Sequence, residues 1–297
     1  MSDGDLPDPR RHAYRPDLAD ARLEGLIAAE RYVQGEPRQV ITPSLPLRRE
    51  PRPDSILETE ALKGETVTVF AESEGWAWVQ IDRDSYVGWM PSEGLSASII
   101  KPTHRIAALR TYVFLEQDAK STPLALLSLN ALFTAKAEEG KFLALEDEGY
   151  VFARHALPAG EVVDDPVAIA EAFLGTPYLW GGRTSIGLDC SGLVQLALEA
   201  AGFNAPRDAD MQAEELGEPV DCERGAKLRR GDLVFWDGHV GIMRSPTDLI
   251  HANAYHMAVE IEPLAEAKER IKAATGSEVI GVRRLPRILA AAEKLRG

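Results

Sequence analysis

The stretch that decides the fold runs from Gly231 to Met243 and reads GDLVFWDGHVGIM. Two short runs rich in β-branched and aromatic residues, 233–236 and 239–243, lie on either side of Asp237-Gly238. An Asp-Gly pair between two such runs predicts a tight turn between antiparallel strands.

Similar runs continue downstream, and helix signals lie upstream. Further strands are predicted at 249–252, 259–261 and 279–282, with a helix near 263–274. Upstream, Asp165 before Pro166 predicts the start of a helix that ends at Gly175, and Asp189 caps a second helix that Gly202 closes. Helices first and strands second, with short connections, predict an α+β fold for this part of the chain.

The region from about 38 to 158 is built from short alternating segments. Strands are predicted at 66–70, 76–81 and 86–90. The segment from Gly140 resembles the segment from Gly75, an offset of 140 − 75 = 65 residues. A weak repeat of this length predicts two small β-barrels in tandem, which resemble bacterial Src-homology-3-type barrels.

These patterns divide the chain into four segments. We expect an N-terminal arm with a short helix over 1–37, barrels over 38–100 and 101–160, and the α+β domain over 161–297. The helix is expected within 18–33, where apolar residues recur near a helical period.

Composition excludes several classes of protein. The 297 residues carry 33 Lys and Arg against 47 Asp and Glu, a net charge of −14, which argues against nucleic acid or an anionic membrane as the main partner. Two cysteines rule out a disulfide scaffold, and the compact ligand pairs of a structural zinc site are missing, so we expect no metal and no other cofactor. No apolar run is long enough to span a bilayer, and the N-terminus lacks the pattern of a secretory signal. We therefore expect a cytoplasmic protein, or a periplasmic or extracellular one if a leader has been removed.

Cys190 is the leading candidate nucleophile. It lies in the segment LDCSG at the predicted first turn of a helix, where the partial positive charge of the helix N-terminus favours the reactive thiolate. The alternative is a small buried hydrophobic residue. Cys222 lies between acidic neighbours that raise a thiol pKa, so it is a poor nucleophile.

His239 and His251 are the candidate partners of Cys190. They lie on strands that a loop connects, so a register with 241 or 239 opposite 251 places both imidazoles on one face of the sheet. A register with 242 opposite 251 places them on opposite faces, and the two residues are then unrelated.

Five motifs in order resemble the NlpC family of papain-like cell-wall cysteine peptidases. They are TPYLWGG from 176, DCSGL from 189, GDLVF from 231, GHVGI from 238 and IHA from 250. The resemblance covers about 165–285 and implies a papain-like domain with a Cys-His-His triad. Cys190 would attack a carbonyl, His239 would be the base, and His251 would orient His239.

The resemblance also implies a substrate. Members of the family cleave stem peptides of peptidoglycan, commonly the γ-D-glutamyl–diaminopimelate bond. A subgroup of γ-D-glutamyl-L-diamino acid endopeptidases carries two such barrels and acts on turnover peptides with a free N-terminal L-Ala. By resemblance, Tyr178 would help to bind the carbonyl, and Asp189, Ser191 and Tyr86 would hold the substrate amine.

Plainer interpretations of these residues remain. Asp189 serves equally as a helix N-cap, Tyr86 as an edge residue of a barrel, and the aromatic Trp180 as part of the core. The competing functions are an exported hydrolase of intact wall, a non-catalytic wall-peptide binding module, and a thiol acyltransferase on a related fold.

Overall fold

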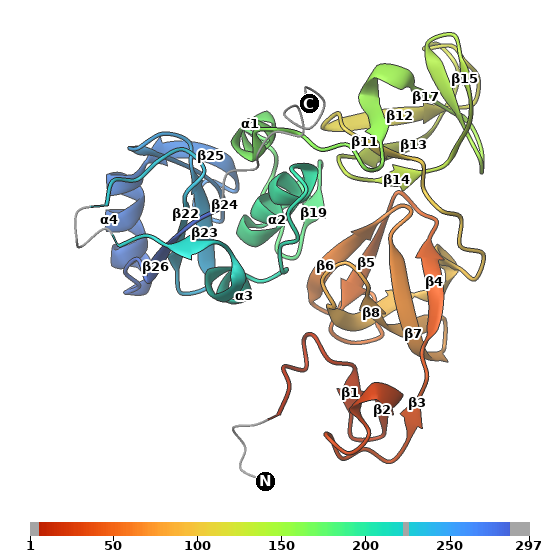
Figure 1. The fold of residues 1–297 in the computed structure, drawn as a ribbon, viewed down its shortest axis with the longest axis horizontal. Coiled ribbons are helices and arrows are strands. Elements are labelled where there is room, and N and C mark those ends of the chain that lie inside the picture. Colours follow the sequence, from red (N-terminus) through yellow and green to blue (C-terminus); the bar gives the residue numbers. More distant parts are fainter. Residues whose placement is uncertain (1–5, 222–225, 286–297) are drawn as a thin grey trace, which may run out of the picture. The chain divides into compact units, whose positions relative to one another are not determined.

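The computed structural model describes residues 6–221 and 226–285, which include neither Cys222 nor the last twelve positions, 286–297. The chain divides into two compact units, Met1–Glu161 and Val162–Gly297 (Figure 1). Among the described residues, the first unit consists of strands and short 3-10 turns, and the second unit combines four α-helices with a six-stranded sheet. Among the described residues, no helix has the length and apolar character that crossing a membrane requires.

The helix predicted within 18–33 is wrong. The segment instead belongs to a three-stranded sheet with a single 3-10 turn, comprising β1 (Tyr14–Arg15), β2 (Leu18–Asp20), η1 (Ala21–Leu23) and β3 (Tyr32–Val33). The Asp20 side chain accepts from the Arg22 amide at 2.9 Å, and Gly25 then adopts φ +83°, which ends the turn. Three of the apolar residues that suggested a helical period, Leu18, Leu23 and Ile27, are buried without an α-helix. A fourth, Leu26, is exposed.

The first barrel is a seven-stranded sheet in the order β10-β4-β7-β8-β9-β5-β6. Its strands are β4 (Glu36–Val40), β5 (Ser44–Arg48), β6 (Leu57–Leu62), β7 (Thr66–Ser73), β8 (Trp76–Ile81), β9 (Val87–Pro91) and β10 (Leu95–Ser96), with η2 (Ser92–Gly94) before β10. Side chains that alternate along the strands, such as Val67, Val79 and Met90, fill the interior.

The second barrel repeats part of this plan. Its sheets have the orders β14-β11-β18 and β13-β12-β17-β16-β15. The strands are β11 (His104–Ile106), β12 (Arg110–Phe114), β13 (Pro123–Ser128), β14 (Leu132–Phe133), β15 (Ala135–Glu139), β16 (Phe142–Leu145), β17 (Tyr150–Phe152) and β18 (Ala156–Pro158), with η3 (Ala153–His155) before β18. The neighbours β15, β16 and β17 correspond to β7, β8 and β9, as the sequence offset predicted.

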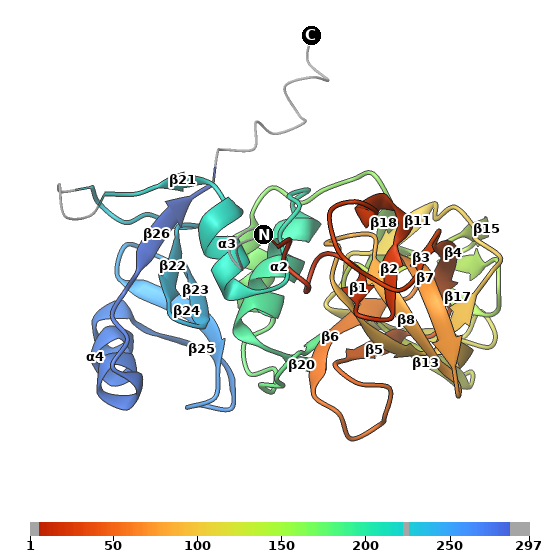
Figure 2. The ribbon, with the colours of Figure 1, turned by 90° about the horizontal axis from the view of Figure 1, so that it is seen from below.

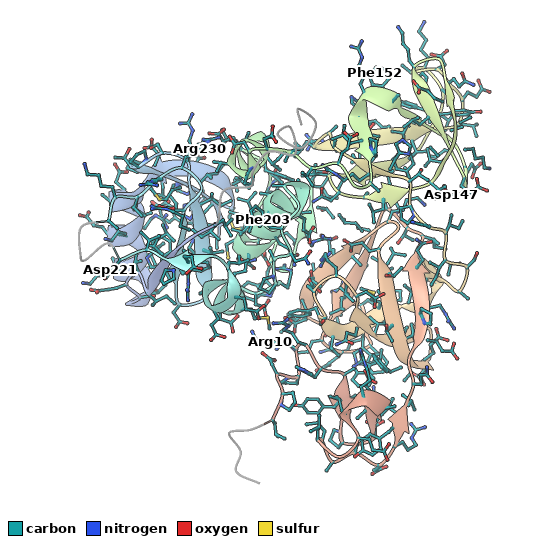
Figure 3. All side chains as sticks on the ribbon, viewed as in Figure 1. Arg10, Asp147, Phe152, Phe203, Asp221 and Arg230 are labelled. Atoms are coloured by element: carbon teal, nitrogen blue, oxygen red, sulfur yellow. The ribbon has the colours of Figure 1, made fainter. Side chains whose placement is uncertain are left out.

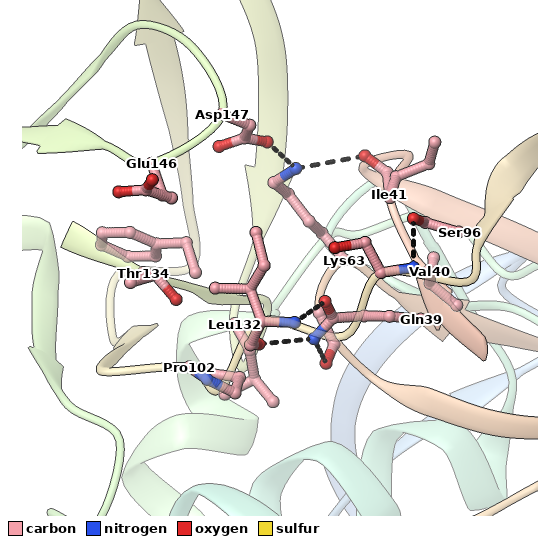
Figure 4. Close-up of a pocket in the computed structure, with 14 residues that line it drawn as sticks. Gln39, Val40, Ile41, Lys63, Ser96, Pro102, Leu132, Thr134, Glu146 and Asp147 are labelled. Carbon is pink, nitrogen blue, oxygen red and sulfur yellow. Dashed lines mark hydrogen bonds and ion pairs between the residues drawn. The ribbon is translucent and has the colours of Figure 1, made fainter. Parts of the chain in front are cut away.

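Polar contacts join the two barrels around a small pocket of about 110 Å³ (Figure 4). Lys63 pairs with Asp147 of the second barrel, and the Leu132 amide donates to the Lys63 carbonyl at 2.8 Å. The side-chain amide of Gln39 donates from Nε2 to the Gly64 and Ile100 carbonyls at 3.0 and 2.9 Å. The ion pair and the hydrogen bond of Lys63 connect the two barrels inside the first unit, whereas the bonds of Gln39 lie within residues 38–100.

The sheet of the second unit has the order β21-β26-β22-β23-β24-β25, with antiparallel neighbours throughout. Its strands are β21 (Glu218–Pro219), β22 (Leu233–Trp236), β23 (His239–Met243), β24 (Asp248–Asn253), β25 (Ala258–Pro263) and β26 (Gly281–Arg284). A two-stranded ribbon, β19 (Arg183–Thr184) and β20 (Gly187–Leu188), precedes it. The sheet is covered by α4 on one face and by α2 and α3 on the other (Figure 2).

The described residues form four α-helices, and the two that follow Asp165 and Asp189 begin where these caps predict. The four helices are α1 (Pro166–Ala172), α2 (Cys190–Ala200), α3 (Ala209–Glu215) and α4 (Leu264–Thr275). The Asp165 side chain caps α1 by accepting from the Val167 amide at 2.9 Å, and it also pairs with Arg230, labelled in Figure 3. The predicted α+β class is confirmed, although α3 lacked a sequence signal strong enough for us to predict it.

Candidate active site

Cys190 is the first residue of α2, and the cap of that helix fixes its position. The Asp189 side chain accepts from the Gly192 amide at 2.7 Å, which closes the first turn. A Cβ atom at Gly192 would lie 2.4 Å from the Gly182 carbonyl oxygen, so glycine is needed for this close approach. The N-terminal turn of α2 therefore packs directly against the backbone at Gly182.

The thiol of Cys190 lies against β23. It is 7% exposed and accepts a hydrogen bond from the amide of Val240, the residue next to His239. Burial, with a smaller effect from the Asp189 carboxylate, raises the pKa of the Cys190 thiol to about 12, and the amides of Val240 and Ser191 oppose this rise only in part. The expectation of a thiolate in the resting site is therefore wrong, because burial outweighs the helix N-terminus.

The two histidines share one face of the sheet. The ladder between β23 and β24 pairs Ile242 with Ile250, and the same register places 241 opposite 251, which is one of the two predicted alternatives. His239 Nε2 lies 2.8 Å from His251 Nδ1, and the ring centroids are 5.0 Å apart. The imidazoles therefore form one hydrogen-bonded pair.

Glu262 and Arg270 extend this pair, and the sequence analysis missed both. His251 Nε2 lies 2.7 Å from Glu262 Oε1 on β25, and the Arg270 guanidinium of α4 pairs with the same carboxylate oxygen. Arg270 also stacks on the Tyr255 ring at 4.4 Å. Alternation of Glu260 and Glu262 with apolar neighbours on β25 was the available signal, since it places both on one face.

Both imidazoles are neutral near pH 7. Burial, followed by the effects of His251 and Arg270, lowers the pKa of His239 to about 3. Burial also lowers the pKa of His251, although Glu262 acts in the opposite direction. Near pH 7, the raised pKa of Cys190 and the lowered pKa of His239 therefore favour a thiol and a neutral imidazole.

Asp189 is held by a buried arginine that the sequence analysis also missed. The Arg207 side chain is 1% exposed and bonds both Asp189 oxygens, at 3.0 and 2.6 Å. It also donates to Ser191 Oγ at 2.8 Å, and the Gly181 amide donates to Asp189 Oδ2 at 2.9 Å. Arg207 thus fixes the two residues that flank Cys190.

The remaining predicted residues lie in different settings. Tyr178 is half-buried, and burial, with smaller effects from Cys190 and Asp189, raises the pKa of its phenol. Trp180 is 60% exposed, so the interpretation of this residue as part of the core is wrong; the turn at Gly181, with φ +73°, follows it directly. Tyr86 belongs to the first unit, where it is 4% exposed within the core of the first barrel, and its role at the substrate stays a prediction.

Within 6–221 and 226–285, no group of three or more His, Cys, Asp or Glu side chains is arranged to hold a metal ion. Cys222, judged a poor nucleophile from its acidic neighbours, lies outside the described residues.

Comparison with known families gives two matches. Residues 175–274 match the NlpC/P60 family, and residues 47–95 match the bacterial dipeptidyl-peptidase Sh3 domain. The first range holds Cys190, His239 and His251, and the second holds Tyr86.

Curated relatives agree with these matches. A γ-D-glutamyl-L-lysine dipeptidyl-peptidase of Bacillus subtilis is 29% identical over 72% of this chain and 78% of its own length. A protein of the same name from Bacillus cereus is 28% identical over 70% of this chain and 71% of its own length. Among solved structures, an NlpC/P60 family protein of Bacillus cereus superposes with a TM-score of 0.71 at 23% identity, covering 84% of this chain and all of its own, which supports the fold.

Proposed function

Since residues 175–274 match the NlpC/P60 family and residues 47–95 match the bacterial dipeptidyl-peptidase Sh3 domain, we propose that the chain is a cysteine peptidase that cleaves the γ-D-glutamyl–diamino acid bond of peptidoglycan stem peptides. The observation that carries the proposal is the contact between the Cys190 thiol and the Val240 amide, beside the hydrogen-bonded pair of His239 and His251. This arrangement supports a site in which Cys190 is the nucleophile, His239 is the base and His251 orients the base.

The reaction would proceed through a thioester. The Cys190 sulfur attacks the γ-carbonyl of D-Glu while His239 Nδ1 takes the thiol proton, and that proton then passes to the leaving amine of the diamino acid. Water, deprotonated by the same imidazole, attacks the thioester and releases the acid and the thiol. We propose that the amide of Cys190, the first residue of α2, stabilises the oxyanion.

We further propose that the substrate carries a free N-terminal L-Ala. The names of the two relatives describe dipeptidyl-peptidases, which release a dipeptide from a free amine. Asp189 and Ser191 flank the nucleophile, where a carboxylate and a hydroxyl would favour an ammonium over an acylated nitrogen. Because Asp189 already forms an ion pair with Arg207, we expect it to hold the first turn of α2 in position as well as to attract the substrate ammonium.

Such a substrate would be a product of cell-wall turnover, and we propose a role in its recycling. A cytoplasmic location would suit free turnover peptides, and fractionation of cells that express the full chain tests it.

The experiment compares four substrates. Purified chain is incubated with L-Ala-γ-D-Glu-diaminopimelate, with the L-Lys analogue, with the N-acetylated tripeptide and with intact sacculi. We expect release of L-Ala-D-Glu from at least one free tripeptide and little cleavage of the acetylated one. Absence of cleavage from both free tripeptides contradicts the proposal, and sacculi cleaved as fast as the tripeptides favour a hydrolase of intact wall.

A further inference from the structure

We propose that Glu262, held by Arg270, is a positioning residue that sets the tautomers of both imidazoles at the site. The proposal rests on the proposed function, because it concerns the base of that reaction. It adds Glu262 and Arg270 to the three residues that the motifs supply. It also assigns a donor and an acceptor to each hydrogen bond in the series that links Arg270, Glu262, His251 and His239.

The geometry forms one continuous line of polar groups. His239 Nε2 faces His251 Nδ1 at 2.8 Å, and His251 Nε2 faces Glu262 Oε1 at 2.7 Å. Arg270 pairs with the same Glu262 oxygen from α4. His251 has 0% exposure, so its ring nitrogens are not in contact with bulk water and must find their hydrogen-bond partners within the protein.

The proton positions follow from the carboxylate. The pKa of Glu262 is lowered, with His251 and Arg270 as its hydrogen-bond partners, so it is an ionised acceptor near pH 7. His251 must then carry its proton on Nε2, and a neutral ring leaves Nδ1 as an acceptor. His239 in turn must donate from Nε2, which leaves its Nδ1 lone pair unprotonated.

This polarity is the one that the reaction requires. Because His239 donates a hydrogen bond from Nε2, its Nδ1 can accept the thiol proton and no other proton has to move. The positive charge that then forms on His239 lies next to the His251 lone pair, and the Glu262 carboxylate stabilises it through the His251 ring. With the opposite tautomer, Nδ1 of His239 would carry a hydrogen and could not act as the base.

Arg270 keeps the carboxylate ionised and oriented. Its cation lowers the pKa of Glu262, and its stacking on Tyr255 restricts the guanidinium. The charged or titratable groups that act on the two imidazoles are each other, Glu262, Arg270 and, for His251, His256. Outside the pair itself, Glu262 is the group among them that accepts a hydrogen bond from one of the two rings.

A matched control lies on the same strand. Glu260 is the cross-strand partner of His251 in the ladder, and its side chain accepts from the Ile261 amide at 3.1 Å. Glu260→Gln removes one negative charge two positions from Glu262 and leaves the line of hydrogen bonds intact.

The decisive measurement is nitrogen-15 NMR of the histidine rings in the full chain without substrate. We expect Nε2–H tautomers for both His239 and His251 in the wild type and in Glu260→Gln. In Glu262→Gln the amide can donate to His251 Nε2, so a population of the reversed tautomer should appear. Nδ1–H on His251 in the wild type overturns the proposal without requiring that any variant fold.

Kinetics provide the second test. We expect Glu262→Gln to lower kcat/KM for the free tripeptide by about 10- to 100-fold with KM nearly unchanged, and Glu262→Asp to recover part of the loss. A change within about twofold, with wild-type tautomers retained, overturns the proposal. If the wild type cleaves none of the tripeptides, the proposed function fails, whereas the NMR result still decides the role of Glu262.

Discussion

Replacement of Arg207 by Met should destabilise the second unit strongly. Arg207 and Asp189 are a buried ion pair, with side chains 1% and 9% exposed and a shortest separation of 2.6 Å. For charge centres ~4 Å apart at an effective dielectric constant of ~20, their attraction is about 4 kcal/mol. Removal of the arginine leaves the Asp189 charge buried at the end of α2, for which a cost of about 3–5 kcal/mol is typical.

The assay is denaturant unfolding combined with hydrogen exchange of the α2 amides, because the chain has two units and exchange assigns the change to one of them. Arg244→Met is the control, since Arg244 is in the same unit but 47% exposed in its pair with Glu171, and we expect a loss of less than about 1 kcal/mol. Addition of Asp189→Asn to Arg207→Met should recover part of the stability, because it removes the orphaned charge. A loss for Arg207→Met no larger than that of the control would refute this reasoning.

Three further predictions follow from the same structure. The rate at which iodoacetamide alkylates Cys190 should rise about tenfold per pH unit between about pH 6 and 9, because the pKa of the thiol is raised to about 12; a rate independent of pH over that range would indicate a preformed thiolate. Arg230 and Arg244 lower the pKa of Glu171 from 4.5 to about 2. The ion pairs of Glu171 with these arginines therefore contribute stability above about pH 4.5, which is lost as the pH falls towards 2. Glu171→Gln should therefore lower the free energy of unfolding by about 1 kcal/mol at neutral pH, and the difference from the wild type should disappear near pH 2. A difference that does not change with pH would contradict this prediction. Gly192→Ala should cost about 1–3 kcal/mol, because the new Cβ meets the Gly182 carbonyl, whereas Gly281→Ala, with open space around it, should be nearly neutral; equal thermal stability of the two variants would contradict the close approach.

Local rules predicted much of the second unit. Asp165 before Pro166, Asp189 before Cys190 and the Asp237-Gly238 turn each act within a few residues, so sequence alone places the helix starts and the hairpin. The register that brings His239 to His251 was one of three that the sequence allowed, and the structure selects it.

The residues that sequence analysis missed act across the fold. Arg207 meets Asp189 eighteen positions away, and Arg270 meets Glu262 from a different element. The alternation on β25 could place Glu262 on a face of the sheet, but a single sequence does not indicate which arginine meets a given carboxylate, because each partner taken alone resembles an ordinary charged surface residue. The resting state of Cys190 was misjudged for a related reason, since the degree of burial that raises its pKa depends on the packing of β23 against α2.

The predicted N-terminal helix failed because a weak apolar period was given more weight than the turn residues within it. Gly25 at φ +83° and the Asp20 cap interrupt the segment, and strand pairing with Tyr32 then satisfies the backbone.

The central claim is that the Cys190 sulfur attacks the peptide and that His239 serves as its base. The most direct measurement is hydrolysis of the free tripeptide by the wild type, Cys190→Ala and His239→Ala, with folding of each variant verified by circular dichroism. We expect no detectable turnover in Cys190→Ala and a loss of at least ~100-fold in His239→Ala. Turnover by either variant at a rate close to that of the wild type would show that the nucleophile or the base lies elsewhere.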